Sequence, residues 1–349
     1  MAAAKNTLVL VTGASGFIAG HCVRELLEQG YLVRGSVRSV QAREKHAHLY
    51  ALAERTGGTL ELVEADLGRD QGWAEAVAGC TYVLHVASPF PAEVPKDEMD
   101  LIRPAVDGTM RVLSACAASG SVKRVVLTSS VAAIAYGHDA QDRKVRTEAD
   151  WSNPDRCEAY QKSKTLAERA AWDFVERQPA DTRFELVVIN PGFVLGPVMS
   201  ADPGTSGEVV RKLLAREMPA CPRIGFAPVD VRDVAIAHRL AMENPQAPGN
   251  RYICAGDHMW IEDMAKVLAA EFNPRGYRVP TGRLPYWLMW IIARFDKTIR
   301  LALEYVGRQE QVSCEKAKRE LGWSMRPVAQ TIVDTGRSMI EYGIVPARA

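Results

Sequence analysis

The feature that most constrains the fold is a regular alternation of short β-rich runs with longer helix-patterned segments through the first half of the chain. The runs that we expect to be strands are residues 7–11, 31–37, 60–64, 82–87, 124–128 and 184–189. Between them, apolar residues recur at spacings of three and four, as on one face of a helix. Parallel strands need a crossover connection, which is usually a helix. The pattern therefore predicts an α/β fold with a doubly wound parallel sheet.

The chain is too long for one compact core, and its texture changes near Asn190. A chain of 349 residues is expected to form a large domain and a smaller one. After Asn190, proline- and glycine-rich loops appear, and the later helical patterns no longer alternate regularly with strands. We predict a sheet domain over residues 1–190 and a smaller, partly helical lobe over 191–349. Residues 226–256 combine a helix pattern with a strand pattern that could return to the sheet, which would make the second lobe discontinuous.

Charge and cysteine usage exclude several classes of function. The net charge of +1 gives no electrostatic reason to expect a nucleic acid or an anionic membrane as partner. The seven cysteines show no CxxC motif and no Cys/His cluster with metal-ligand spacing, so we predict no metal site. They are interpreted as reduced thiols of a cytoplasmic protein, and the N-terminus has no pattern of a signal peptide.

The longest apolar segment near the C-terminus is LPYWLMWIIARF, residues 284–295. It is well short of the roughly 20 residues that span a bilayer, so no integral membrane segment is predicted. The favoured interpretation is a buried helix, with a lid over a cleft and a membrane-surface contact as alternatives.

The first predicted strand runs into a glycine-rich loop, VTGASGFIAG, that opens a predicted helix. In this context, Gly13 and Gly16 let the backbone approach a pyrophosphate, whose charge then lies against the free N–H groups at the helix N-terminus. We therefore predict dinucleotide binding by Gly13, Ser15, Gly16, Phe17 and Ile18. The simpler interpretation is a tight turn between a strand and a helix.

The end of the second strand bears on which dinucleotide is bound. An acid there would accept a hydrogen bond from the ribose 2′-hydroxyl, whereas a 2′-phosphate requires cations. The strand ends at Val37 without an acid, and Arg38, with help from Lys45, could meet a phosphate. The pattern thus favours NADPH/NADP+ over NADH, although these cations could also be solvated charges.

Two further strand ends are candidate cofactor contacts. Asp66 and Leu67 follow the third strand, where an aspartate could reach the adenine amino group. The segment HVASP, with Val86, Ala87 and Ser88, ends the fourth. Both segments would lie at the carboxyl edge, where such sheets bind ligands.

The motif YQKSK places two lysines close to one tyrosine, and helical geometry separates them. Positions four apart share a face of a helix, whereas positions two apart point in nearly opposite directions. Tyr160 and Lys164 therefore share the buried stripe, and Lys162 lies on the charged face. An ammonium group on a buried stripe is costly without a partner, which suggests a functional reason for Lys164.

Five motifs, TGASGFIAG, HVASP, VLTSSVAA, YQKSK and NPGFVLGP, occur in the order and approximate spacing of the extended short-chain dehydrogenase/reductase family. In wording, the chain resembles the branch of this family that contains dihydroflavonol reductases and cinnamoyl-CoA reductases. The resemblance implies a Rossmann fold, a substrate-binding second lobe and a Ser–Tyr–Lys site.

By this resemblance, Tyr160 would be the general acid or base and Lys164 would lower its pKa and hold the nicotinamide ribose. Ser130 would orient the substrate carbonyl, with Ser129 as the alternative serine. The backbone around Pro191 would lie beside the nicotinamide, with Phe193 or Val194 packed on it.

The resulting prediction is an NADPH-dependent carbonyl reductase acting on an aldehyde or ketone as monomer or homodimer. Aromatic residues of the second lobe suggest a bulky or aromatic substrate, namely Phe193, Tyr286, Trp287 and Trp290. The alternatives are an NAD-dependent hydroxysteroid-type dehydrogenase, a nucleotide-sugar epimerase and a non-enzymatic nucleotide sensor. The missing acid at Val37 disfavours the first, and the retained tyrosine and lysine disfavour the last.

Overall fold

The computed structural model of the chain describes residues 6–89, 97–139, 141–180, 183–295, 300, 303–309 and 311–348, so residues 1–5 of the N-terminal stretch lie outside the described residues. Its main sheet is parallel throughout, with the strand order β10-β6-β5-β4-β1-β2-β3. The strands are β1 (Leu8–Val11), β2 (Leu32–Val37), β3 (Leu60–Glu64), β4 (Tyr82–His85), β5 (Arg124–Thr128), β6 (Glu185–Pro191) and β10 (Arg251–Cys254). The predicted doubly wound parallel sheet is confirmed, and its order is that of a dinucleotide-binding fold extended by one strand.

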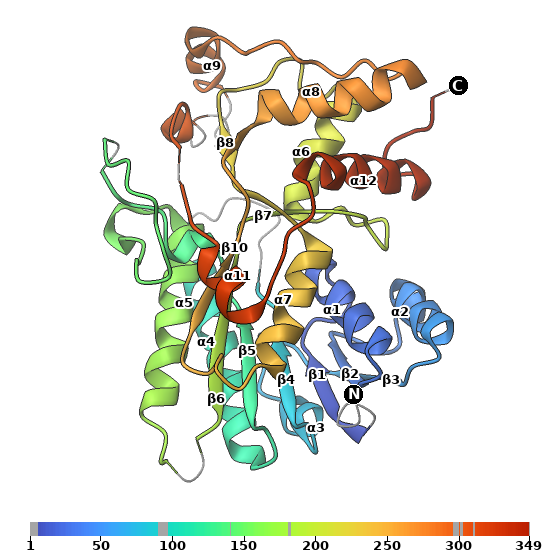
Figure 1. Cartoon of the computed structure of the whole chain (residues 1–349), viewed down its shortest axis with the longest axis vertical. Coiled ribbons are helices and arrows are strands. Elements are labelled where there is room, and N and C mark those ends of the chain that lie inside the picture. The colour runs from blue at the N-terminus through green and yellow to red at the C-terminus, as the bar shows by residue number, and fades with distance from the viewer. Residues whose placement is uncertain are drawn as a thin grey trace.

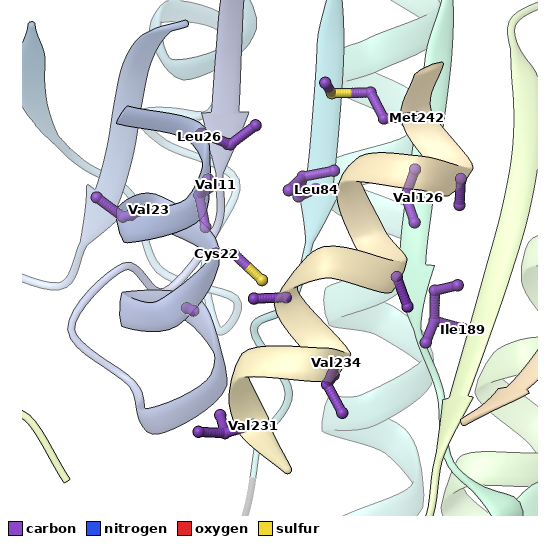
Figure 2. Close-up of a cluster of buried hydrophobic side chains, with 14 of the residues drawn as sticks. Val11, Cys22, Val23, Leu26, Leu84, Val126, Ile189, Val231, Val234 and Met242 are labelled. Carbon is purple, nitrogen blue, oxygen red and sulfur yellow. The ribbon is translucent and has the colours of Figure 1, made fainter. Parts of the chain in front are cut away.

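Helices cover both faces of this sheet (Figure 1). One face carries α1 (Phe17–Glu28), α2 (Arg43–Thr56), α7 (Val231–Glu243) and α11 (Glu315–Leu321), and the other carries α3 (Trp73–Val77), α4 (Met99–Ser119) and α5 (Ala159–Glu176). Figure 2 shows the first layer, where side chains of α1 and α7 meet Leu84, Val126 and Ile189 of three neighbouring strands. Each fully buried side chain of this size contributes roughly 1.5–3 kcal/mol to stability.

A second lobe with its own core lies beyond the carboxyl edge of the sheet (Figure 1). Its helices are α6 (Gly204–Leu214), α8 (Ile261–Phe272), α9 (Tyr286–Ile292) and α12 (Val328–Glu341), and its short strands pair as β7 (Phe193–Leu195) with β9 (Pro228–Asp230) and β8 (Gly225–Phe226) with β11 (Met259–Trp260). The 3₁₀ turns are η2 (Val131–Ala133), η3 (Pro154–Arg156), η4 (Asn273–Arg275) and η5 (Leu303–Tyr305).

The chain returns from the second lobe to the main sheet. Helix α7 packs on α1, and β10 pairs with β6, with Arg251 opposite Val188. We propose that residues 1–190 and 226–256 form one domain, on which α11 also packs, and that the rest of 191–349 is the discontinuous second lobe.

The favoured prediction of a buried helix at residues 284–295 is wrong. Helix α9 has only seven residues, and its side facing the second-lobe core presents Met289, which is 3% exposed. The aromatic side chains of Tyr286, Trp287 and Trp290 are 57%, 63% and 47% exposed. Within the described part of the chain, no helix is long and apolar enough to cross a membrane.

Candidate active site

The glycine loop joins β1 to α1 at the carboxyl edge of the sheet. Gly13 has a φ of +64°, and a Cβ atom built on it would lie 3.0 Å from the Cβ of Ala87, so both the backbone conformation and the close approach require glycine. Gly16 caps α1 without a side-chain hydrogen bond, and the first turn of α1 contains no acid. Ser15 and Gly16 are exposed. The positive end of this helix is therefore free to receive an anionic group.

Thr12 ties this loop to the end of β4. Its hydroxyl is 2.9 Å from Nδ1 of His85 and accepts a hydrogen bond of 2.9 Å from the backbone N–H of Ala87. The Thr12 hydroxyl and the His85 ring thus share one hydrogen bond that joins β1 to β4. Burial, with the charge of Lys164, lowers the pKa of His85 to about 3, so this ring is neutral at physiological pH. Neither residue was predicted as part of the site, although Thr12 lies within the motif VTGASGFIAG and His85 begins the motif HVASP.

Ser130, Tyr160 and Lys164 lie together where β5 and β4 end. Ser130 caps the turn η2 by accepting from Ala132 at 3.1 Å, and its side chain is hydrogen-bonded to the hydroxyl of Tyr160. Ser129 instead donates to the buried Glu168 at 2.5 Å. The geometry thus favours Ser130 over Ser129 as the serine of the site.

Lys164 reaches from helix α5 to the segment that follows β4. It lies one turn after Tyr160 on α5, and its Nζ donates to Ser88 Oγ at 3.0 Å. Lys162 forms an ion pair of 2.7 Å with Glu98, so it has its partner on the charged face of the helix. The two lysines thus lie on different faces of α5, as the helical wheel predicted, and the catalytic role of Lys164 stays a prediction.

Burial dominates the electrostatics of the tyrosine and the lysine. Burial raises the pKa of Tyr160, and the hydrogen bond with Ser130 partly offsets this rise. Burial also lowers the pKa of Lys164 to about 8, and the negative charge of Glu168 partly opposes this shift. At neutral pH the tyrosine is therefore a phenol and the lysine is mainly an ammonium ion.

The predicted contacts around the adenosine end lie at the carboxyl ends of β2 and β3. Arg38 directly follows β2, Lys45 lies in the first turn of α2, and both are exposed. Among the described residues, neither has an ion pair. Asp66 caps a turn by accepting from Gly68 N–H at 2.7 Å, and Leu67 packs against Gly108 of α4. These positions are accessible to a ligand along one edge of the sheet.

The segment after β6 lies where the sheet meets the second lobe. Pro191 is buried and opposite Cys254 of β10. Val194 is 7% exposed and belongs to the core beside α1 and α7. Phe193 stacks on Phe226 with ring centroids 4.2 Å apart. Val194 is therefore mainly a packing residue, and Phe193 is the more accessible of the two.

The second lobe reaches α5 beside the tyrosine. Gln161 donates to the hydroxyl of Tyr305 at 2.9 Å, and Tyr305 contacts the edge of Tyr136. These three residues line a cavity of about 60 Å³ together with His138 and Arg308. The exposed aromatic residues of α9, Tyr286, Trp287 and Trp290, do not line this cavity, and their contact with a substrate stays a prediction.

A parallel sheet of this order, with a glycine loop after β1 and a Ser–Tyr–Lys cluster beside it, defines the class of extended short-chain dehydrogenase/reductases. The chain belongs to the NAD dependent epimerase/dehydratase family, whose model matches residues 9–255. The resemblance drawn from the motifs is thus confirmed.

Relatives along almost the whole chain are named as reductases. The chain is 37% identical to Cinnamoyl-CoA reductase 1 of Petunia hybrida over 350 residues, which cover 99% of this chain and 96% of that protein. It is 34% identical to Tetraketide alpha-pyrone reductase 1 of Arabidopsis thaliana over 342 residues, with 96% of each chain covered. The solved structure of yeast methylglyoxal/isovaleraldehyde reductase Gre2, complexed with NADPH, matches with a TM-score of 0.77 and 30% identity over 97% of this chain and 100% of that chain.

Proposed function

We propose that this protein is an NADPH-dependent reductase of aldehydes or ketones, with Tyr160 as its general acid. The observation that carries the proposal is the hydrogen bond between Tyr160 and Ser130. Lys164, one turn later on the same helix, contacts Ser88 at the carboxyl edge of the sheet, where the dinucleotide would bind. The names of the relatives, and the NADPH in the Gre2 complex, support the reaction and the cofactor.

The residues that follow β1 and β2 at the carboxyl edge of the sheet fit a dinucleotide. The uncapped start of α1 and the close approach of Gly13 to Ala87 form a cradle that a side chain would fill. Ser15, Gly16, Phe17 and Ile18 would line the pyrophosphate, and Arg38 with Lys45 would meet a 2′-phosphate. When bound, NADPH supplies the hydride that reduces the carbonyl carbon.

Ser130 and Tyr160 would bind and protonate the oxygen of the substrate carbonyl. Ser130 would donate a hydrogen bond to the carbonyl and orient it, and Tyr160 would deliver the proton as the oxygen gains charge. A phenol with a raised pKa is a weak acid, so the neighbouring ammonium of Lys164 is needed to stabilise the phenolate that remains. Water or a hydroxyl chain would then return the proton.

The test is a cofactor oxidation assay with NADPH and NADH across aldehydes, ketones, ketosteroids and sugar nucleotides. We expect turnover of NADPH with aldehydes or ketones. Preferred turnover of ketosteroids with NADH would instead support the dehydrogenase, and isomerisation of a sugar nucleotide without net cofactor turnover would support the epimerase. Binding of NADPH without turnover of any of these compounds would contradict the proposal.

Arg38→Ala should raise the KM for NADPH by about 10- to 100-fold, because a hydrogen bond between charged groups is worth roughly 1.5–3 kcal/mol. The KM for NADH should change much less, since NADH lacks the 2′-phosphate. Arg55→Ala, at the exposed far end of α2, is the matched control and should alter neither value. Equal effects of Arg38→Ala on both cofactors would rule out contact with the 2′-phosphate.

A further inference from the structure

A buried ion pair lies directly beneath the proposed catalytic residues. Glu168 is one turn after Lys164 on α5, and its side chain is fully buried. Its Oε1 accepts from Arg251 Nε of β10 at 2.5 Å. Neither Glu168 nor Arg251 was predicted from the sequence to take part in the site.

The carboxylate of Glu168 accepts hydrogen bonds from residues on or beside three strands of the sheet. Besides Arg251 of β10, Oε2 accepts from Ser129 after β5 at 2.5 Å and from Asn190 of β6 at 2.8 Å. The amide of Asn190 also donates to the backbone carbonyl of Ser130 at 3.2 Å. The peptide that presents Ser130 is therefore fixed on both sides by groups bound to one carboxylate.

Arg251 is itself held from a second direction. Its guanidinium stacks on the ring of Trp151 at 3.8 Å and donates to the backbone carbonyls of Glu148 and Asp150 at 3.1 and 2.7 Å. These three residues belong to the loop that leads into η3 and α5. The ion pair thus links β10, β5, β6 and the start of α5, the elements that position the serine, the tyrosine and the lysine.

The same carboxylate also acts on Lys164 through charge. Among the residues that the structure describes, Lys164 interacts with Glu168 one turn later on α5, with His85 of β4 and with Ser88 after β4, and Tyr160 lies one turn earlier on the same helix. His85 is neutral and Tyr160 is a phenol at neutral pH, so Glu168 is the negative charge that favours the ammonium form. A lysine buried without such a charge loses its proton at lower pH.

We propose that Glu168, with Arg251 as its counterion, is a positioning residue that holds Ser130 in place and keeps Lys164 protonated. This inference rests on the proposed function. It goes further in assigning a second layer of residues to the site, each of them contributed by a different segment of the chain.

Glu168→Gln should move the basic limb of the kcat–pH profile to lower pH by about one unit, because Lys164 is the first group of the site to lose its proton. It should also lower kcat at neutral pH by tenfold or more while changing the KM for NADPH less. Glu168→Asp keeps the charge and shortens the side chain, so it should lower kcat but leave the basic limb in place.

The control for a purely structural role is Arg124→Met. Arg124 is also a buried arginine of the same sheet, paired with Glu185 at 2.7 Å, but it lies at the opposite end of β5. It should lower the melting temperature without moving the pH profile. A Glu168→Gln enzyme that behaves in the same way, with lower stability and an unchanged profile, would overturn the proposal.

If Glu168→Gln fails to fold, the double variant Glu168→Gln, Arg251→Met removes the unpaired cation and should show the same shift. A readout that needs no turnover separates this inference from the proposed function. The rate at which an amine-reactive reagent labels Lys164, followed by peptide mass spectrometry against pH, should reveal a lower pKa in the variant. Unchanged labelling would refute the inference even if no substrate is found.

Discussion

Tyr160→Phe should lower kcat for carbonyl reduction by about 10²- to 10⁴-fold, the usual contribution of a positioned general acid. The substitution removes one hydroxyl and leaves the ring, so helix α5 and the hydrogen-bond partners of Lys164 should remain in place. The dissociation constant for NADPH, measured by fluorescence titration, should change by no more than a few fold. Initial rates of NADPH oxidation give the loss in turnover.

The control for this prediction is Tyr31→Phe. Tyr31 is a buried tyrosine whose hydroxyl donates to Glu243 at 2.7 Å, away from the strand ends that form the site. It should affect stability rather than turnover. A Tyr160→Phe enzyme with full activity would show that another group delivers the proton.

Lys164→Met should lower kcat by about 10²-fold or more, because the positive charge that stabilises a phenolate beside it is lost. Binding of NADPH should weaken as well, since the proposed role of Lys164 includes the ribose hydroxyls. The melting temperature should hold or rise, because methionine avoids the desolvation of a partly buried ammonium. Steady-state kinetics and a thermal melt measure both effects.

Lys162→Met is the matched control, two residues away on the same helix. It breaks a partly exposed ion pair with Glu98, which is worth about 0–1 kcal/mol in stability, and it should leave kcat unchanged. Equal losses in the two variants would mean that the tyrosine does not depend on a particular lysine.

The main sheet could be predicted well from the sequence because its signals are local. Strands buried on both faces are continuous apolar runs, and a glycine loop after the first strand indicates a dinucleotide-binding fold. The six expected strands lie within two residues of those observed. Tyr160 and Lys164 were assigned to one face by helical spacing alone, and the structure places them there.

The contacts that cross the chain were harder to predict. Glu168 continues the spacing of Tyr160 and Lys164 by four more residues, so the helical wheel contained the signal, but its partner Arg251 is 83 residues further along. The surface position of α9 was missed for a related reason. Its apolar composition suggests burial, but the seven-residue helix packs on the second-lobe core through Met289, and nothing local to the segment reveals this.

Strand β10 has a consequence for the order in which the protein forms during synthesis. When the first 190 residues have left the ribosome, the glycine loop, Ser130, Tyr160 and Lys164 are all present, yet Glu168 still lacks Arg251. A buried carboxylate without its cation is strongly unfavourable. The nascent chain should therefore keep this helix face hydrated until residue 251 has been made, so that a site encoded early in the sequence is completed late in folding.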